Sequence, residues 1–314
     1  MEKQVTTSES AAISGRNGSV EALIETFVNE QDIRASSRKT YERNLRAFFC
    51  WLSERGQQLS DITRAELIQY KEEQLQRGLS PLTVCGYIVT LRKFYQWAAG
   101  RGLCIDITAG LKTPRRKQTF KKQHLQDEES AALLTYFQGL SLRNFAIVNL
   151  LLRTGLRTIE VQRADVGDIQ RKGGRRVLMV QGKGHDSKDD FVILSDKTYT
   201  PIANYLATRP RAKAGEPLFV SSSHNNAGGR LTTRAISGMC KDGLKAIGID
   251  SREYTAHSLR HTTAVTILKQ GGSITDVQNV LRHASPATSQ IYTESIKEEL
   301  RLQDGAELLL DGAF

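Results

Sequence analysis

The sequence predicts a mainly α-helical protein with a small antiparallel β-sheet, organised as a helical N-terminal domain and a larger C-terminal domain. Three observations predict this fold class. Apolar residues recur at helical spacing up to about residue 110, three short β-type runs with glycine turns lie between residues 165 and 194, and helical periodicity returns near residue 198. A chain of 314 residues is long enough for two such domains.

The N-terminal domain is predicted over residues 18–111, after a polar segment, 1–17, that is expected to be flexible. Four helices are expected: one behind the cap candidate Ser19, then 37–54, 63–77, and a last helix that opens with Ser80-Pro81 and ends at Gly100. A capping serine followed by proline at the first helical position is typical of a helix start. This part of the chain is therefore predicted to be a four-helix domain.

A basic segment, 112–124, is predicted to be a solvated linker that follows a phosphate backbone. The C-terminal domain is predicted over 125–303, with a tail at 304–314. It opens with acidic residues suited to a helix start and contains the apolar run AIVNLLL, long enough for a buried helix. Strands are expected near 165–170, 175–181 and 189–194, with turns at Gly173-Gly174 and Gly182-Lys183-Gly184.

The charge of the chain favours a polyanionic partner. Lys and Arg number 44 against 34 Asp and Glu, which gives a net charge of +10 and a pI near 9.5. Nucleic acid is preferred to an anionic membrane, because no apolar run reaches membrane-spanning length. The four cysteines are irregularly spaced and contain no Cys-x-x-Cys pair, so we expect reduced thiols and a cytoplasmic protein.

Four short segments could carry chemistry. They are TGLR (154–157) with Glu160, GKG (182–184), HSLRH (257–261), and LRH (281–283) with Tyr292. Two arginine forks can bind the non-bridging oxygens of a phosphodiester in its transition state, and a lysine on a hairpin can protonate a leaving oxygen. A tyrosine, whose hydroxyl has an ordinary pKa of about 10, becomes a nucleophile where cations stabilise the phenolate. The set suits transesterification without a metal ion or cofactor.

Each segment alone also has an ordinary interpretation. Arg157 could be a surface arginine, Lys183 a solvated hairpin tip, and Tyr292 a core residue of an amphipathic helix. His257 and His261 have the i, i+4 spacing of a zinc pair, but no Glu follows His257 and a neighbouring arginine would oppose a metal ion. The joint occurrence of the segments in this order is the stronger evidence.

In these segments the chain resembles the tyrosine recombinases, also called the phage integrase family, over about residues 18–300. The matching stretches are TGLRTIE, VLMVQGKG, TAHSLRHTTAV and VLRHASPATSQIYT. The N-terminal helices are similar to the family's SAM-like core-binding domain, and the rest to its catalytic domain. One departure is Arg282, which stands where the family commonly has glycine.

The resemblance implies a role for each matching residue in the cleavage and rejoining of DNA. Tyr292 attacks the scissile phosphate and becomes linked to the 3′ end. Arg157 and Arg260 hold the non-bridging oxygens, and Lys183 protonates the leaving 5′-oxygen.

The remaining matches have assisting roles. His257 assists with the proton of the nucleophile, His283 donates a hydrogen bond to the phosphate, and Glu160 orients the site. Exchange of one phosphodiester for another needs no ATP and proceeds through a Holliday junction.

The predicted partner is double-stranded DNA at a specific core site. Basic residues on two N-terminal helices repeat away from the apolar face and are candidate phosphate contacts: Arg38, Lys39, Arg43, Arg46, Arg92 and Lys93. Each of them could equally be part of a solvated helix face. The apolar tail AELLLDGAF is expected to dock on a neighbouring protomer of a homo-tetramer on paired sites, possibly with a related recombinase, or else to fold onto its own domain.

Three other functions compete with site-specific recombination. A type IB topoisomerase-like enzyme shares the chemistry but needs no partner duplex, and an idle DNA-binding accessory protein would be expected to have lost some of the set. A metal-dependent nuclease would need clustered carboxylates. With the core-binding helices beginning near residue 18, we expect no arm-binding domain and prefer a simple recombinase acting at short core sites.

Overall fold

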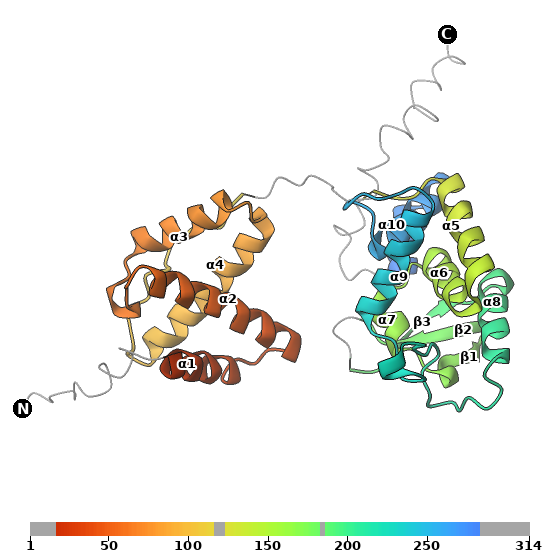
Figure 1. Cartoon of the computed structure of the whole chain (residues 1–314), viewed down its shortest axis with the longest axis horizontal. Helices are drawn as coiled ribbons and strands as arrows, with labels where there is room; N and C mark the ends of the chain where they lie inside the picture. Colours follow the sequence, from red (N-terminus) through yellow and green to blue (C-terminus); the bar gives the residue numbers. More distant parts are fainter. Residues whose placement is uncertain (1–16, 116–122, 183–185, 283–314) are drawn as a thin grey trace, which may run out of the picture. The chain divides into compact units, whose positions relative to one another are not determined.

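The computed structural model describes residues 17–115, 123–182 and 186–282, and the chain divides into two compact units, Met1–Gln118 and Thr119–Phe314. The predicted fold class is confirmed: both units are built mainly of helices, and the second also contains a small antiparallel sheet (Figure 1). None of the described helices is long and apolar enough to cross a bilayer.

Over residues 17–115 the first unit contains four helices, α1 (Asn17–Asn29), α2 (Ala35–Glu54), α3 (Arg64–Gln76) and α4 (Pro81–Gly100), with a short 3-10 turn, η2 (Leu59–Asp61). The predicted start of the fourth helix is confirmed, because Ser80 Oγ accepts the backbone N–H of Thr83 (3.2 Å) and Pro81 follows at the first helical position. The first helix begins two residues earlier than the predicted cap.

Aromatic rings fill the centre of this unit. Phe48 of α2 is fully buried and lies within 6.3 Å, centroid to centroid, of Trp51, Tyr70 and Tyr95, which come from α2, α3 and α4. Such ring pairs stabilise a core beyond the area that they bury. The first unit therefore has a hydrophobic core of its own.

The second unit contains the remaining elements. In chain order they are α5 (Asp127–Leu140), α6 (Leu142–Thr154), α7 (Thr158–Arg163), η3 (Val166–Asp168), β1 (Ile169–Lys172), β2 (Arg175–Val180), β3 (Asp190–Ile193), α8 (Asp196–Ala207), η4 (His224–Asn226), α9 (Thr233–Ala246), α10 (Ala256–Lys269) and α11 (Ile274–Leu281). The strands pair antiparallel in the order β1-β2-β3, with Leu178 of β2 between Ile169 and Val192.

The predicted first strand is partly wrong. Residues 166–168 form a 3-10 turn, and the strand begins at Ile169. The Asp168 carboxylate accepts the backbone N–H of Asp165 (2.6 Å), and Gly167 N–H donates to the Ala214 carbonyl (2.8 Å), so these backbone groups are not available to a sheet ladder. The predicted glycine turn between β1 and β2 is confirmed, with both glycines at positive φ.

Two glycines of α9 give a matched test of how this helix packs. A Cβ at Gly243 would overlap the buried ring of Phe137 on α5, whereas Gly238 has open space around it. We expect Gly243→Ala to lower the free energy of unfolding by about 1–3 kcal/mol, and Gly238→Ala to raise it by about 0.5–1 kcal/mol through helix propensity. Urea denaturation of the two variants measures both values, and equal effects would contradict the packing of α5 on α9.

Candidate active site

Arg157 lies in the turn between α6 and α7, and its backbone and side chain are both held by Glu160. Gly155 ends α6 in the left-handed conformation (φ 61°), and Arg157 then caps α7 with an extended backbone. The Arg157 N–H donates to Glu160 Oε2 (2.6 Å), and its Nη1 donates to Glu160 Oε1 (3.0 Å). The Arg157 side chain is 27% exposed, whereas that of Glu160 is fully buried. The guanidinium is therefore both anchored and accessible to a ligand.

Arg260 is buried, with 1% of its surface exposed. It lies in the second turn of α10, and its guanidinium donates to the carbonyls of Gly155 and Leu281. These carbonyls end α6 and α11, where helical carbonyls lack intrahelical partners. In the described structure Arg260 therefore joins two helix ends, and the contact with a phosphate remains a prediction.

His257 lies in the first turn of α10. Its side chain is exposed, and its ring stands perpendicular to that of buried His261, with centroids 4.7 Å apart. Within the described ranges no group of three or more His, Cys, Asp or Glu residues is placed to hold a metal ion. The pair is arranged as an edge-to-face ring contact.

Three of the predicted residues, Lys183, His283 and Tyr292, lie outside the described residues. Arg157, Glu160 and Arg260 meet where α6 ends and α7 begins: Arg157 contacts the Glu160 carboxylate, as does Arg282 at the end of α11, while Arg260 binds the turn that leads to Arg157. Two guanidinium groups share the one buried carboxylate, and that of Arg157 is in addition accessible to a ligand. Such a cluster suits a phosphodiester, whose charge grows in the transition state.

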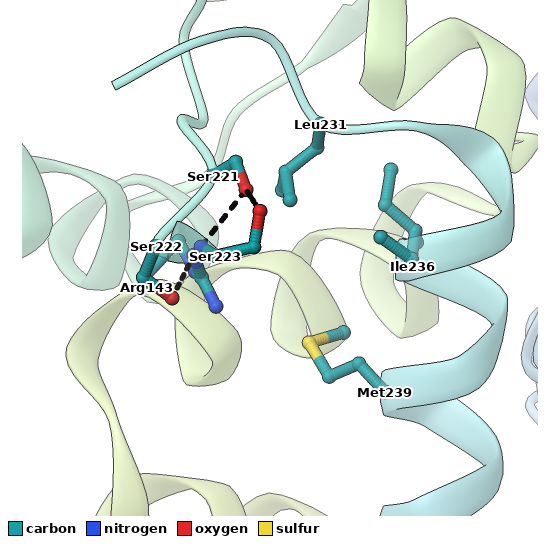
Figure 2. Close-up of a pocket in the computed structure, with 8 residues that line it drawn as sticks. Arg143, Ser221, Ser222, Ser223, Leu231, Ile236 and Met239 are labelled. Atoms are coloured by element: carbon teal, nitrogen blue, oxygen red, sulfur yellow. Dashed lines mark hydrogen bonds between the residues drawn. The ribbon is translucent and has the colours of Figure 1, made fainter. Parts of the chain in front are cut away.

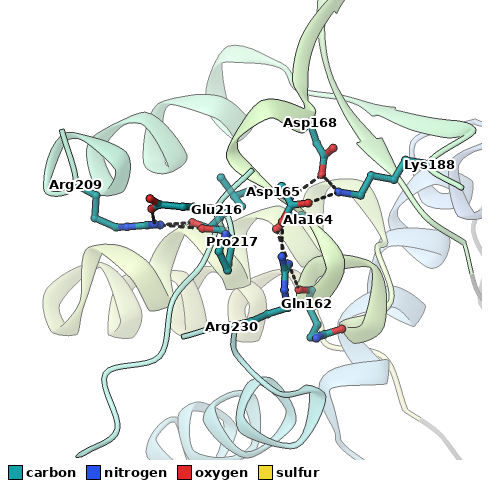
Figure 3. Close-up of polar contacts among 10 residues, drawn as sticks. Gln162, Ala164, Asp165, Asp168, Lys188, Arg209, Glu216, Pro217 and Arg230 are labelled. Atoms are coloured by element: carbon teal, nitrogen blue, oxygen red, sulfur yellow. Dashed lines mark hydrogen bonds and ion pairs between the residues drawn. The ribbon is translucent and has the colours of Figure 1, made fainter. Parts of the chain in front are cut away.

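Both arms of the loop between β2 and β3 are anchored to the segment around α7, a feature that has no signal in the sequence. Arg163 Nη1 donates to the Gly182 carbonyl (3.1 Å) on one arm. On the other, Lys188 Nζ donates to Asp165 Oδ2 (2.6 Å) and Asp168 Oδ2 (2.5 Å), as Figure 3 shows. No local signal distinguishes Lys188 from other loop lysines, because its partners lie some twenty residues earlier.

Arg230 completes this ion-pair cluster. It pairs with the Asp165 carboxylate and donates to the carbonyls of Gln162 (2.9 Å) and Ala164 (3.2 Å) (Figure 3). Burial alone would raise the pKa of Asp165, but the hydrogen bonds from Lys188 and Arg230 outweigh it and lower that pKa. The Asp165 carboxylate therefore stays charged at neutral pH, and the cluster ties Lys188, just before β3, to the segment that follows α7.

A pocket between α6 and α9 contains none of the predicted site residues. Figure 2 shows Arg143 beside three serines, 221–223, with Leu231, Ile236 and Met239 opposite. The guanidinium of Arg143 is already used, since Nη1 donates to the Val220 carbonyl (2.9 Å) and to Ser222 Oγ (3.1 Å). Arg143 thus holds the serine loop in place.

The candidate DNA contacts of the first unit lie on α2 and α4. Lys39, Arg43, Arg46 and Lys93 are exposed, and Arg38 and Arg92 are partly buried. Arg46 is paired with the Glu21 carboxylate through Nε (3.0 Å) and Nη2 (2.9 Å), so a phosphate would have to compete with this acid. Arg92 donates to the Leu111 carbonyl. The DNA contacts of all six residues remain predictions.

The comparisons with known proteins decide the family. The model of the phage integrase family matches residues 123–299, more than half of the chain, and that of the phage integrase N-terminal SAM-like domain matches residues 20–102. The chain belongs to the phage integrase family.

Relatives of known name agree with this membership. The chain is 29% identical to tyrosine recombinase XerD of Listeria monocytogenes serovar 1/2a, over 92% of this chain and 97% of that protein. It is 29% identical to tyrosine recombinase XerC of Mycobacterium bovis, over 84% and 90%. The same fold is seen in a crystal structure of the XerH site-specific recombinase bound to palindromic difH substrate, a post-cleavage complex. The TM-score is 0.73 at 21% sequence identity, and the match covers 92% of this chain and 84% of that chain.

As a phage integrase family member of this kind, the protein is a site-specific tyrosine recombinase that acts on DNA. The two family matches fall on different compact units, the SAM-like match on the first and the catalytic match on the second. The arginine cluster therefore lies in the part of the chain that matches the catalytic domain.

Proposed function

We propose that the protein cleaves and rejoins DNA with Tyr292 as the nucleophile, assisted by Arg157, Lys183, Arg260 and the histidines His257 and His283. The observation that carries this proposal is the accessible Arg157 guanidinium, anchored on the buried Glu160 carboxylate. A planar arginine fork binds two phosphate oxygens and keeps its proton at working pH. The site thus contains a fixed cation where charge develops during phosphoryl transfer.

In the proposed reaction the Tyr292 oxygen forms a bond to phosphorus, and the bond from phosphorus to the 5′-oxygen breaks. His257 assists removal of the phenolic proton, and Lys183 delivers a proton to the leaving 5′-oxygen. His283 donates a hydrogen bond to a phosphate oxygen. The 5′-hydroxyl of a partner strand reverses these steps. Each step exchanges one phosphodiester for another, so neither ATP nor a metal ion is required.

The proposed assembly is a homo-tetramer on two core sites in the cytoplasm. Family membership and the net charge of +10 support contacts with many phosphates of the DNA backbone. The proposed contacts are the basic residues of α2, α4 and segment 112–124. The apolar tail, 304–314, is proposed to dock on a neighbouring protomer. Both the linker segment 116–122 and the tail lie outside the described residues.

A paired-site assay tests this proposal. Core sites are first selected by the full-length protein from randomised duplexes, and supercoiled plasmids then carry one or two copies. We expect recombinant products from two-site plasmids and no relaxation of one-site plasmids, because strand exchange needs a partner duplex. A variant without residues 304–314 should bind single sites normally and lose paired-site products. Efficient relaxation of one-site plasmids would contradict recombination and indicate topoisomerase activity.

A further inference from the structure

Arg282, at the end of α11, adopts a backbone conformation that glycine adopts more readily. Its φ of 53° and ψ of 54° lie in the left-handed region, and no other residue besides glycine has a positive φ within the described ranges. An L side chain is strained in this region, whereas glycine is not. The backbone therefore does not account for an arginine here, and the explanation has to come from the side chain.

The side chain of Arg282 is turned inward, with only 9% of it exposed. Nη2 lies 2.9 Å from Glu160 Oε2, and Nη1 donates to the Val280 carbonyl (2.8 Å). Nε lies 3.7 Å from Asp190 Oδ2, at the start of β3. The principal partner of this arginine is thus the buried carboxylate that also anchors Arg157.

Glu160 consequently serves two arginines at once. Oε1 accepts from Arg157 Nη1 (3.0 Å), and Oε2 accepts from Arg157 N–H (2.6 Å) and Arg282 Nη2 (2.9 Å). A buried carboxylate paired with a single guanidinium would neutralise it. With the second guanidinium present, the carboxylate is shared, so the charge of Arg157 is only partly neutralised and positive charge remains at Arg157 for an approaching phosphate, while Asp190 lies 3.7 Å from Arg282 Nε.

We propose that Arg282 is a positioning residue that acts through Glu160. It shares the Glu160 carboxylate with Arg157 and fixes the orientation of that carboxylate. The Arg157 guanidinium is thereby held toward the scissile phosphate, and less of its positive charge is neutralised by Glu160. The same contact ties the end of α11 to the start of α7. This inference rests on the proposed function, because the scissile phosphate is the ligand in both.

The test compares Arg282→Gly with wild-type full-length protein on a nicked suicide duplex. We expect covalent-complex formation to slow about tenfold, since loss of an orienting contact misplaces the reacting groups. The DNA dissociation constant should stay unchanged, and the thermal midpoint checks the fold, since glycine relieves the backbone while the ion pair with Glu160 is lost. Arg211→Gly, which removes an exposed arginine from the turn after α8, is the matched control and should cleave normally. Arg282→Lys, which keeps a charge without the fork, should restore part of the rate.

A double-mutant cycle with Glu160→Gln shows whether Arg282 acts through Glu160. In the Glu160→Gln background there is no carboxylate to share, so adding Arg282→Gly should change the cleavage rate by less than about twofold. A tenfold effect in both backgrounds would overturn the inference and indicate a direct phosphate contact, and an Arg282→Gly variant as fast as wild type would overturn it too. Absence of any covalent product from wild type would instead overturn the proposed function, and the inference with it.

Discussion

Replacing Arg157 with alanine is expected to lower the rate of DNA cleavage by about 10²–10³-fold, the effect of removing one fixed donor to a developing charge. The loss should lie in chemistry and not in folding. The Arg157 side chain is partly exposed, and without it Glu160 still has Arg282 and a backbone N–H as partners. Single-turnover cleavage of a nicked duplex measures the rate, and circular dichroism checks the fold.

Arg157→Lys is the informative control for this prediction. Lysine keeps the charge but lacks the planar fork, so we expect a rate between those of wild type and Arg157→Ala. If Arg157→Ala cleaved within about threefold of wild type, a difference below 1 kcal/mol, Arg157 would not contact the scissile phosphate.

Replacing Arg260 with alanine is expected to reduce the stability of the second unit as well as its activity. The substitution removes a buried guanidinium and leaves the carbonyls of Gly155 and Leu281 without this donor. Each buried acceptor that loses its partner costs about 1–3 kcal/mol, so for two carbonyls we expect the free energy of unfolding to fall by about 2–6 kcal/mol.

Urea denaturation of the Arg260 variants measures this loss. Arg260→Lys should recover part of the stability, because one ammonium group cannot span two carbonyls as a guanidinium fork does. The contrast with Arg157→Ala is the decisive comparison, since Arg260 is buried between two helix ends whereas the Arg157 side chain is 27% exposed. An Arg260→Ala variant as stable as wild type would contradict the buried cross-link.

Local pattern was sufficient to predict most helices. The Ser80-Pro81 start of α4 and the apolar run inside α6 both have signals within a few residues of the element itself. The start of β1 was predicted too early, because Asp165 to Asp168 satisfy their backbone through a local carboxylate and the distant Ala214. Distant partners of this kind leave no trace in local periodicity.

The sequence was enough to name candidate residues of the site, but not to predict which side chains contact one another. The family resemblance supplied Arg157 and Glu160, which the structure places in direct contact. The burial of Arg260 depends on packing between α6, α10 and α11, and the Arg282–Glu160 pair joins residues 122 positions apart. The departure at Arg282 was visible in the sequence, but its partner was not, since side-chain direction at a helix end depends on tertiary structure.

The most direct test of the central claim is covalent trapping of the protein on a suicide duplex that carries a nick near a selected core site, with EDTA present throughout. Wild-type protein is predicted to give a protein–DNA adduct linked to the 3′ end, and Tyr292→Phe to give none while binding the duplex equally well. An adduct formed by Tyr292→Phe, or a wild-type reaction abolished by EDTA, would contradict metal-independent cleavage by Tyr292.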